Sequence, residues 1–335
     1  MMKSLLKFTL RLVGVVGAIV LLLVGFWMVA ERLDEGAREQ FMADDSHRRP
    51  LAVTDLGEMP GILTESSGIA VSQNHPGVLW SHNDSGDRPR FFQIDMAGTL
   101  GATYLVEGAG AVDWESMDLG PCPVPAETSC VYAADIGDNS RRRDTLTLYV
   151  IAEPDPSIED VPAELLGSIH YSYPDERYDA EAFAVAPDGT LIVITKGRTP
   201  DIWLFQMTRT EAANAMASGA LHTFSSGIRL PIEPDFNLSR VTTGAAVSPD
   251  GSILAVRTYS EIYFFAWPVP GEPVEAAPIC FLGTMEPQGE AIAFGSDGTL
   301  LLTSEDNLNG EGHLLAVRCA GIGADGVMPA PSPQG

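Results

Sequence analysis

The chain has 335 residues and a formal net charge of −25, because 45 acidic residues outnumber 20 lysines and arginines. A protein this acidic repels phosphate backbones, so we exclude a nucleic-acid-binding role. The acidity fits the binding of hard metal cations, although it also serves solubility.

The first predicted element is a membrane anchor. Residues 12–30 form an uncharged run long enough to cross a bilayer as a helix. Basic residues precede the run and acidic residues follow it, which predicts a cytoplasmic N-terminus. A cleaved signal peptide is the competing interpretation, but no A-x-A cleavage site follows. We expect residues 1–30 to hold the protein in the inner (cytoplasmic) membrane by a single pass, with a periplasmic or extracellular domain.

Three further segments follow the anchor. Residues 31–50 are polar and weakly periodic, as expected of a juxtamembrane stalk. Residues 51–320 consist almost entirely of short apolar runs and turns, apart from a predicted helical insertion at 211–217. Residues 321–335 are rich in Gly, Pro and Ala, which predicts a disordered tail.

An internal repeat determines the predicted fold. Five segments share one phrase that opens with Ser, Thr or Glu: SGIAV at Ser67, ESMDL at Glu115, EAFAV at Glu181, TGAAV at Thr243 and EAIAF at Glu290. A turn and a second apolar run follow each phrase, and two more strands can be read after most of them. The pattern predicts an all-β, five-bladed propeller of four-stranded antiparallel blades. Residues 51–56 would supply the missing outer strand of the last blade. An open β-sandwich would not explain the recurring phrase.

The opening residues of the phrases predict a metal site. The first strand of each blade lines the central channel, so these residues should converge: Ser67, Glu115, Glu181, Thr243 and Glu290. Converging carboxylates repel one another unless a cation neutralises them. Oxygen donors without His or Cys favour Ca²⁺ over other ions. The alternative is a water-linked carboxylate channel without metal.

The ends of the second strands supply candidate catalytic residues. They are Asp84, Asp138, Lys196 and Arg257. Such a mixed rim could hold an anionic small-molecule substrate while a metal polarises a phosphoryl oxygen. The aspartates could equally cap tight turns. The sequence contains no G-x-S-x-G elbow, P-loop or G-x-G-x-x-G motif, which argues against a serine hydrolase and a helix-bound nucleotide.

The four cysteines all follow the predicted anchor, in a compartment that oxidises thiols. Cys122 and Cys130 flank a proline-rich loop, which favours a local disulfide. Cys280 and Cys319 would then form the second pair. Metal-type C-x-x-C spacing is absent, so zinc is not expected.

These phrases resemble the calcium-activated nucleotidases, or apyrases, which are five-bladed propellers that hydrolyse nucleoside di- and triphosphates. The ring order of Ser67, Glu115, Glu181, Thr243 and Glu290 is similar to the family's calcium ligands, with Thr where the family has Ser. SHNDSGD, ADIGDN, TKGR and VRTYSE stand where the family has its rim residues. The resemblance implies a membrane-anchored, calcium-dependent phosphohydrolase. The phrases also resemble uncharacterised bacterial membrane-anchored propellers and, more remotely, the β-propeller phytases.

Two other functions stay open at this point. A non-catalytic propeller could use calcium for stability and bind a ligand or another protein. A propeller glycosidase could use two channel carboxylates as acid and base beside an aromatic platform, for which Trp80 and Trp114 are candidates.

Overall fold

The computed structural model describes residues 48–124, 129–158, 161–235, 239–306 and 310–322. The predicted anchor, most of the predicted stalk and the tail from residue 323 lie outside these ranges. Within the described ranges, no helix is both long enough and apolar enough to cross a membrane. The anchor therefore stays a prediction.

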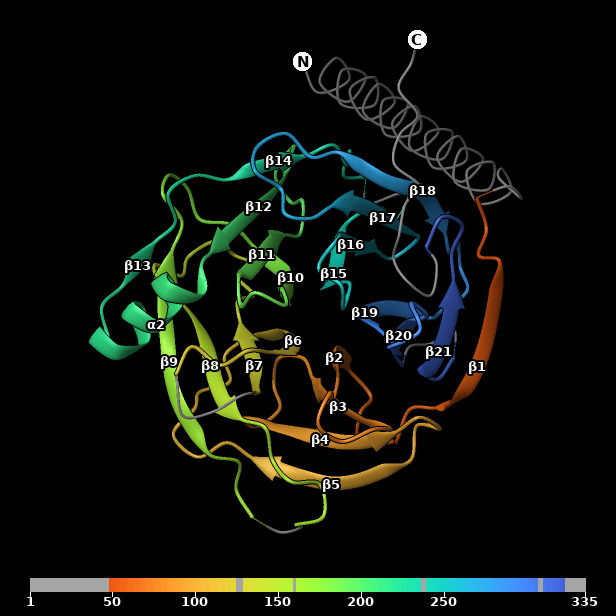
Figure 1. Cartoon of the computed structure of the whole chain (residues 1–335), viewed down its shortest axis with the longest axis horizontal. Coiled ribbons are helices and arrows are strands. Elements are labelled where there is room, and N and C mark those ends of the chain that lie inside the picture. The colour runs from red at the N-terminus through yellow and green to blue at the C-terminus, as the bar shows by residue number, and fades with distance from the viewer. Residues whose placement is uncertain (1–47, 125–128, 159–160, 236–238, 307–309, 323–335) are drawn as a thin grey trace, which may run out of the picture. The chain divides into compact units, whose positions relative to one another are not determined.

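Five sheets surround a common centre, and each contains a four-stranded antiparallel blade (Figure 1). Blade 1 contains β2 (Ser66–Val71), β3 (Val78–Asn83), β4 (Arg90–Asp95) and β5 (Leu100–Leu105). Blade 2 contains β6 (Trp114–Gly120), β7 (Cys130–Asp135), β8 (Leu146–Ala152) and β9 (Leu165–Ser172). Blade 3 contains β10 (Ala180–Val185), β11 (Leu191–Thr195), β12 (Ile202–Met207) and β14 (Ile228–Leu230). Blade 4 contains β15 (Thr242–Val247), β16 (Ile253–Thr258), β17 (Glu261–Ala266) and β18 (Glu275–Phe281). Blade 5 contains β19 (Gln288–Phe294), β20 (Leu300–Glu305), β21 (His313–Arg318) and β1 (Ala52–Glu58).

The two ends of the propeller meet in blade 5. β1 pairs antiparallel with β21, with Val53 opposite Val317. This pairing confirms that residues 51–56 contribute the outer strand of the last blade. The inner strands contact one another in the closed order β2, β6, β10, β15 and β19. The predicted five-bladed, all-β propeller with four-stranded blades is therefore confirmed.

The core consists of five separate hydrophobic clusters, one between each pair of neighbouring blades. For example, Trp80 of blade 1 packs with Met117 of blade 2, and Ile69 of blade 1 packs with Leu301 of blade 5. Small residues in the inner strands allow the blades to approach the centre. A Cβ on Gly244 would lie 2.6 Å from the carbonyl oxygen of Glu290 in the next blade. The glycine of the TGAAV phrase is therefore required by packing.

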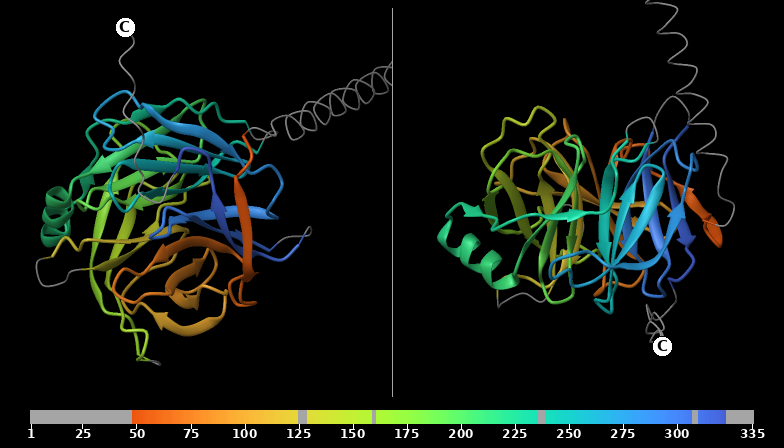
Figure 2. Two further views of the ribbon diagram at one scale, coloured as in Figure 1. Left: turned by 45° about the vertical axis from the view of Figure 1, so that its right-hand side comes forward. Right: turned by 90° about the horizontal axis from the view of Figure 1, so that it is seen from above.

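The predicted insertion after β12 links blades 2 and 3. Thr208 and Glu211 form a capping box at the start of α2 (Arg209–Ser218), and Gly219 ends it in a left-handed conformation with φ 63°. The chain then adds β13 (His222–Thr223) in parallel to β9 of blade 2 before it returns to blade 3 as β14. Figure 2 shows α2 at the outside of the propeller.

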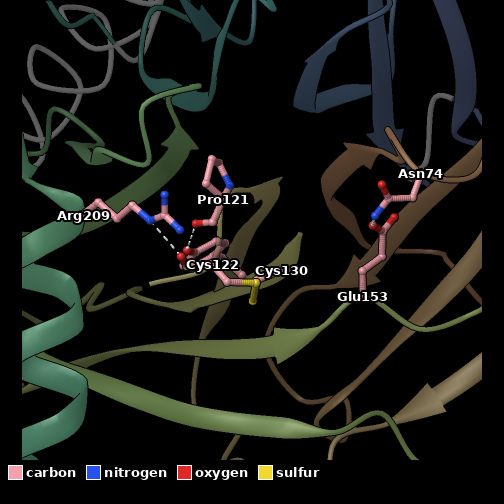
Figure 3. Close-up of a disulfide and its surroundings, with 7 residues drawn as sticks. Asn74, Pro121, Cys122, Cys130, Glu153 and Arg209 are labelled. Carbon is pink, nitrogen blue, oxygen red and sulfur yellow. Dashed lines mark hydrogen bonds between the residues drawn. A yellow bond between two sulfur atoms is a disulfide. The ribbon is translucent and has the colours of Figure 1, made fainter. Parts of the chain in front are cut away.

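Both predicted disulfides are confirmed. Cys122 pairs with Cys130, and Cys280 pairs with Cys319. The first lies beside α2, where Arg209 Nε donates a hydrogen bond of 2.8 Å to the carbonyl oxygen of Cys122 (Figure 3). The second joins the outer strand of blade 4 to the end of β21 in blade 5. It therefore reinforces the seam next to the closing strand.

Candidate metal-binding site at one end of the channel

The five residues that open the repeated phrase occupy the same structural position in every blade. In each case the pairing between the first and second strands skips one residue. The skipped residues are Ser67, Glu115, Glu181, Thr243 and Glu290. Such a bulge leaves one residue out of the ladder and redirects its side chain. We call these residues the inner ring.

The three inner-ring glutamates are buried close enough to repel one another. Glu115, Glu181 and Glu290 are each 4% exposed. Burial, followed by repulsion from Glu181, raises the pKa values of Glu115 and Glu290 well above the usual range. Burial also raises the pKa of Glu181 to about 7, although Lys196 opposes this shift. The positive charge near the three carboxylates is therefore too small to balance them.

The other two inner-ring residues offer hydroxyl oxygens. Ser67 Oγ donates to the carbonyl oxygen of Glu65 at 3.3 Å, which leaves its lone pairs available. Thr243 is 1% exposed, and its Oγ1 has no hydrogen-bond partner within the described part of the chain. An unpaired buried hydroxyl is costly, and a bound cation would relieve that cost.

A second set of residues lies one step beyond the inner ring. The inner-strand residue just before each bulge pairs with Asn83, Asp135, Thr195, Thr258 or Ser304 of the second strand. The residues that follow these partners are therefore equivalent, and we call them the outer ring: Asp84, Ile136, Lys196, Tyr259 and Glu305.

Lys196 brings positive charge to the inner ring. Its Nζ forms an ion pair with Glu181 Oε1. Burial alone would lower the pKa of Lys196. The carboxylates of Glu181, Glu115 and Glu290 raise the pKa by more, so the net shift is upward. The structure therefore places this predicted catalytic residue among the glutamates of the inner ring.

Blade 2 differs from the others, because its outer-ring position is the apolar Ile136. Asp113 supplies a carboxylate there instead, since Ile136 N donates to the carbonyl oxygen of Asp113 at 3.1 Å. Carboxylate oxygens of Asp84, Asp113 and Glu115 all lie within 4.8 Å of one another. Burial and the charge of Asp84 raise the pKa of Asp113 to about 6. Burial also raises the pKa of Asp84.

Gly137 makes room for these carboxylates. A Cβ at this position would overlap Glu115 Oε1 and Asp113 Oδ2. The glycine of the ADIGDN phrase therefore has a steric role at the site. Asp113 stands two residues before Glu115 but outside the repeated phrase, so the repeat did not indicate it.

Glu305 is the outer-ring residue of blade 5. Gln288 Nε2 donates to Glu290 Oε1 at 3.0 Å and to Glu305 Oε2 at 2.5 Å, which joins the two rings. Burial and repulsion from Asp84 raise the pKa of Glu305 to about 7. Burial and the neighbouring Glu290 carboxylate also raise the pKa of Tyr259.

Two predicted catalytic residues have other roles. Arg257 is fully buried, forms an ion pair with Glu286 and donates from Nη1 to the carbonyl oxygen of Thr303 at 3.1 Å. Arg257 is therefore held by groups in or just before blade 5. The Asp138 carboxylate accepts hydrogen bonds of 2.8 Å from the backbone N–H groups of Arg142 and Arg143. It caps a turn, which was the alternative interpretation.

The aromatic platform required by the glycosidase interpretation is not formed by the predicted residues. Trp80 and Trp114 are 0% and 2% exposed and pack in the hydrophobic cluster between blades 1 and 2. Their rings cannot stack on a sugar at the surface. The structure therefore gives no support to the glycosidase alternative.

The similarity of this chain to known proteins is confined to the fold. No family model matches the sequence, and no curated protein matches it. Among solved structures, a PQQ-bound aldose sugar dehydrogenase from Streptomyces coelicolor is similar at a TM-score of 0.45 and 11% identity, over 80% of this chain and 98% of that one. A putative oxidoreductase (glucose dehydrogenase) from Thermus thermophilus gives 0.45 and 13%, over 79% and 99%. Similarity at this level carries no argument about function. It does not support the resemblance to calcium-activated nucleotidases.

Proposed function

We propose that this end of the propeller binds a divalent cation, Ca²⁺. The main ligands are Asp84, Asp113 and Glu115, and oxygens of the inner ring complete the coordination. The convergence of these three carboxylates carries the proposal, because each has a raised pKa that a bound cation would reverse. The unpaired Thr243 hydroxyl and the space left by Gly137 support it independently.

The donor atoms favour calcium over the other common ions. They are carboxylate and hydroxyl oxygens, which exclude the softer ligand sets of zinc and copper. Calcium accepts six to eight oxygens in variable geometry, whereas magnesium requires a compact octahedron. Ligands from several blades suit the larger and more adaptable ion.

We also propose that the propeller lies outside the cytoplasm. The two disulfides support this location, because the cytoplasm keeps most protein thiols reduced. The uncharged run at residues 12–30 supplies the predicted anchor.

Calorimetric titration of the full-length chain, purified in detergent and stripped with chelator, tests calcium binding. We expect saturable binding of Ca²⁺, weaker binding of Mg²⁺, and large losses of Ca²⁺ affinity in Asp113→Asn and Glu115→Gln. Asp155→Asn is the matched control, since Asp155 is exposed and only caps a turn through Ser157. Equal calcium affinity in all four proteins would refute the site.

The second candidate function is calcium-dependent hydrolysis of nucleotides or other phosphoesters. Lys196 favours it, because its ammonium lies beside the proposed ion site and could bind an anionic substrate. A bound calcium would supply electrophilic polarisation of a phosphoryl oxygen. Arg257, the other candidate cation, is paired with the buried Glu286.

Phosphate release measures this candidate directly. The wild-type chain and Lys196→Met, each with and without calcium, are incubated with nucleoside di- and triphosphates and with simple phosphoesters. Release that requires both calcium and Lys196 would support hydrolysis. A protein that binds calcium yet releases no phosphate under any condition would leave the non-catalytic binding propeller as the function.

A further inference from the structure

A cavity lies at the opposite end of the five inner strands. It has a volume of about 220 Å³. Its lining includes one residue from near the end of each inner strand: Val71, Leu119, Val185, Val247 and Phe294. The inner-ring residues stand at the starts of the same strands. Four residues of extended chain separate the two levels, which corresponds to about 13 Å. We call this space the basal cavity.

One carboxylate lies in the wall of the basal cavity. Among the described residues that line the basal cavity, Asp118 of β6 is the only charged one. Its Oδ1 accepts a hydrogen bond of 2.7 Å from Leu119 N, and its Oδ2 accepts one of 2.7 Å from Val185 N in the next blade. These bonds fix the carboxylate between two blades and leave one lone pair on each oxygen.

Asp118 has no cationic partner within the described residues. Burial raises its pKa to about 7, and the opposing interactions are the two backbone hydrogen bonds. A carboxylate without a cationic partner at this position costs stability, and an apolar side chain would fill the position without that cost. A perturbed carboxylate of this kind in a concave site is a feature of ligand-binding positions.

We propose that the basal cavity binds a small organic cation, with its ammonium group against Asp118 and its apolar part against Val185, Val247 and Phe294. The volume supports the size of this ligand, because an apolar cavity of about 150 Å³ holds benzene. A ligand with a few more atoms than benzene fits. The site is independent of the calcium site, since the two occupy opposite ends of the inner strands.

Butylammonium is the probe, and butan-1-ol is its uncharged counterpart. Ligand-detected NMR on the full-length chain gives both affinities. We expect butylammonium to bind at least about tenfold more tightly than butanol, because only the cation pairs with the carboxylate. Equal affinities, or the absence of saturable butylammonium binding, would overturn the proposal.

Three variants locate the binding. Asp118→Asn removes the charge, so the preference for the cation should disappear, although its amide oxygen can accept from only one of the two backbone N–H groups that Asp118 binds. Val247→Phe fills the cavity and should weaken both probes, which keeps the test valid if Asp118→Asn does not fold. Asp155→Asn, an exposed turn residue outside both sites, should change neither. An unchanged preference in Asp118→Asn, unchanged binding in Val247→Phe, or loss of binding in Asp155→Asn would refute the site.

Discussion

Replacement of Lys196 by methionine tests the electrostatics of the candidate site most directly. Methionine retains much of the apolar stem and removes the ammonium that pairs with Glu181. Removal of one partner of a buried ion pair costs about 3–5 kcal/mol, which corresponds to a fall in Tm of roughly 6–20 °C for a domain of this size. We expect the lower end of that range in ion-free protein at neutral pH, because Glu181, with a pKa of about 7, can take up a proton.

Calcium should affect this variant in the opposite direction. For a separation of about 8 Å, the repulsion between a unit charge and a divalent ion would be roughly 4 kcal/mol at an effective dielectric constant of about 20. Salt screens part of this repulsion, so we expect a gain of about 2 kcal/mol, or about 30-fold in calcium affinity. The ion should then raise the Tm of Lys196→Met by more than that of the wild type.

Titration calorimetry and thermal denaturation, each with and without calcium, measure both effects. Arg177→Met is the matched control, because Arg177 is 51% exposed and pairs only with the exposed Asp144. It should change neither the Tm nor the calcium affinity appreciably. If Lys196→Met bound calcium no more tightly than the wild type, the ammonium would not share the ion's surroundings, and the proposed arrangement would be wrong.

Further predictions concern the same site and the stability of the propeller. Gly137→Ala should displace the carboxylates of Asp113 and Glu115 and weaken calcium binding at least about tenfold in calorimetry, with little loss of stability in chelator. The site carboxylates have raised pKa values when folded, so the folded ion-free protein binds more protons than the unfolded chain. Its free energy of unfolding should therefore fall as pH rises from about 4 to about 7 in denaturant titrations, while calcium affinity increases over the same window. Arg257→Met should cost about 3–5 kcal/mol by leaving the buried Glu286 unpaired, and a simultaneous Glu286→Met should recover much of the loss. Removal of the Cys280–Cys319 disulfide, which spans 39 residues, should cost about 4 kcal/mol, against about 2.5 kcal/mol for the Cys122–Cys130 disulfide, which spans 8.

The blade architecture was predictable because the same packing constraint acts at every inner strand. Strands near the centre need small buried residues, so phrases such as TGAAV and EAIAF recur along the chain. Each phrase also opens with a polar residue, and these five polar residues are the ones that the bulges leave unpaired. The closing strand followed from counting strands, since the last repeat was one short.

The roles of individual rim residues were less predictable. Lys196 and Arg257 both end apolar runs, yet the pairing makes Lys196 equivalent to Tyr259 and places Arg257 two positions earlier, inside β16. A shift in strand register changes the surroundings of a side chain, and the sequence does not reveal that register. Asp113 was missed because it precedes the repeated phrase. It supplies a carboxylate near the outer-ring position of blade 2, which is occupied by the apolar Ile136.

The pairing of β1 with β21 has a consequence for the biogenesis of the protein. Val53 lies near the start of the propeller and Val317 near its end, so blade 5 cannot be completed until nearly the whole chain has been synthesised. If the chain is exported from its N-terminus, β1 must wait unpaired on the far side of the membrane while the other blades form. An unpaired strand can join a foreign edge during that interval. Proteins that bind extended segments during secretion would protect the chain at this stage.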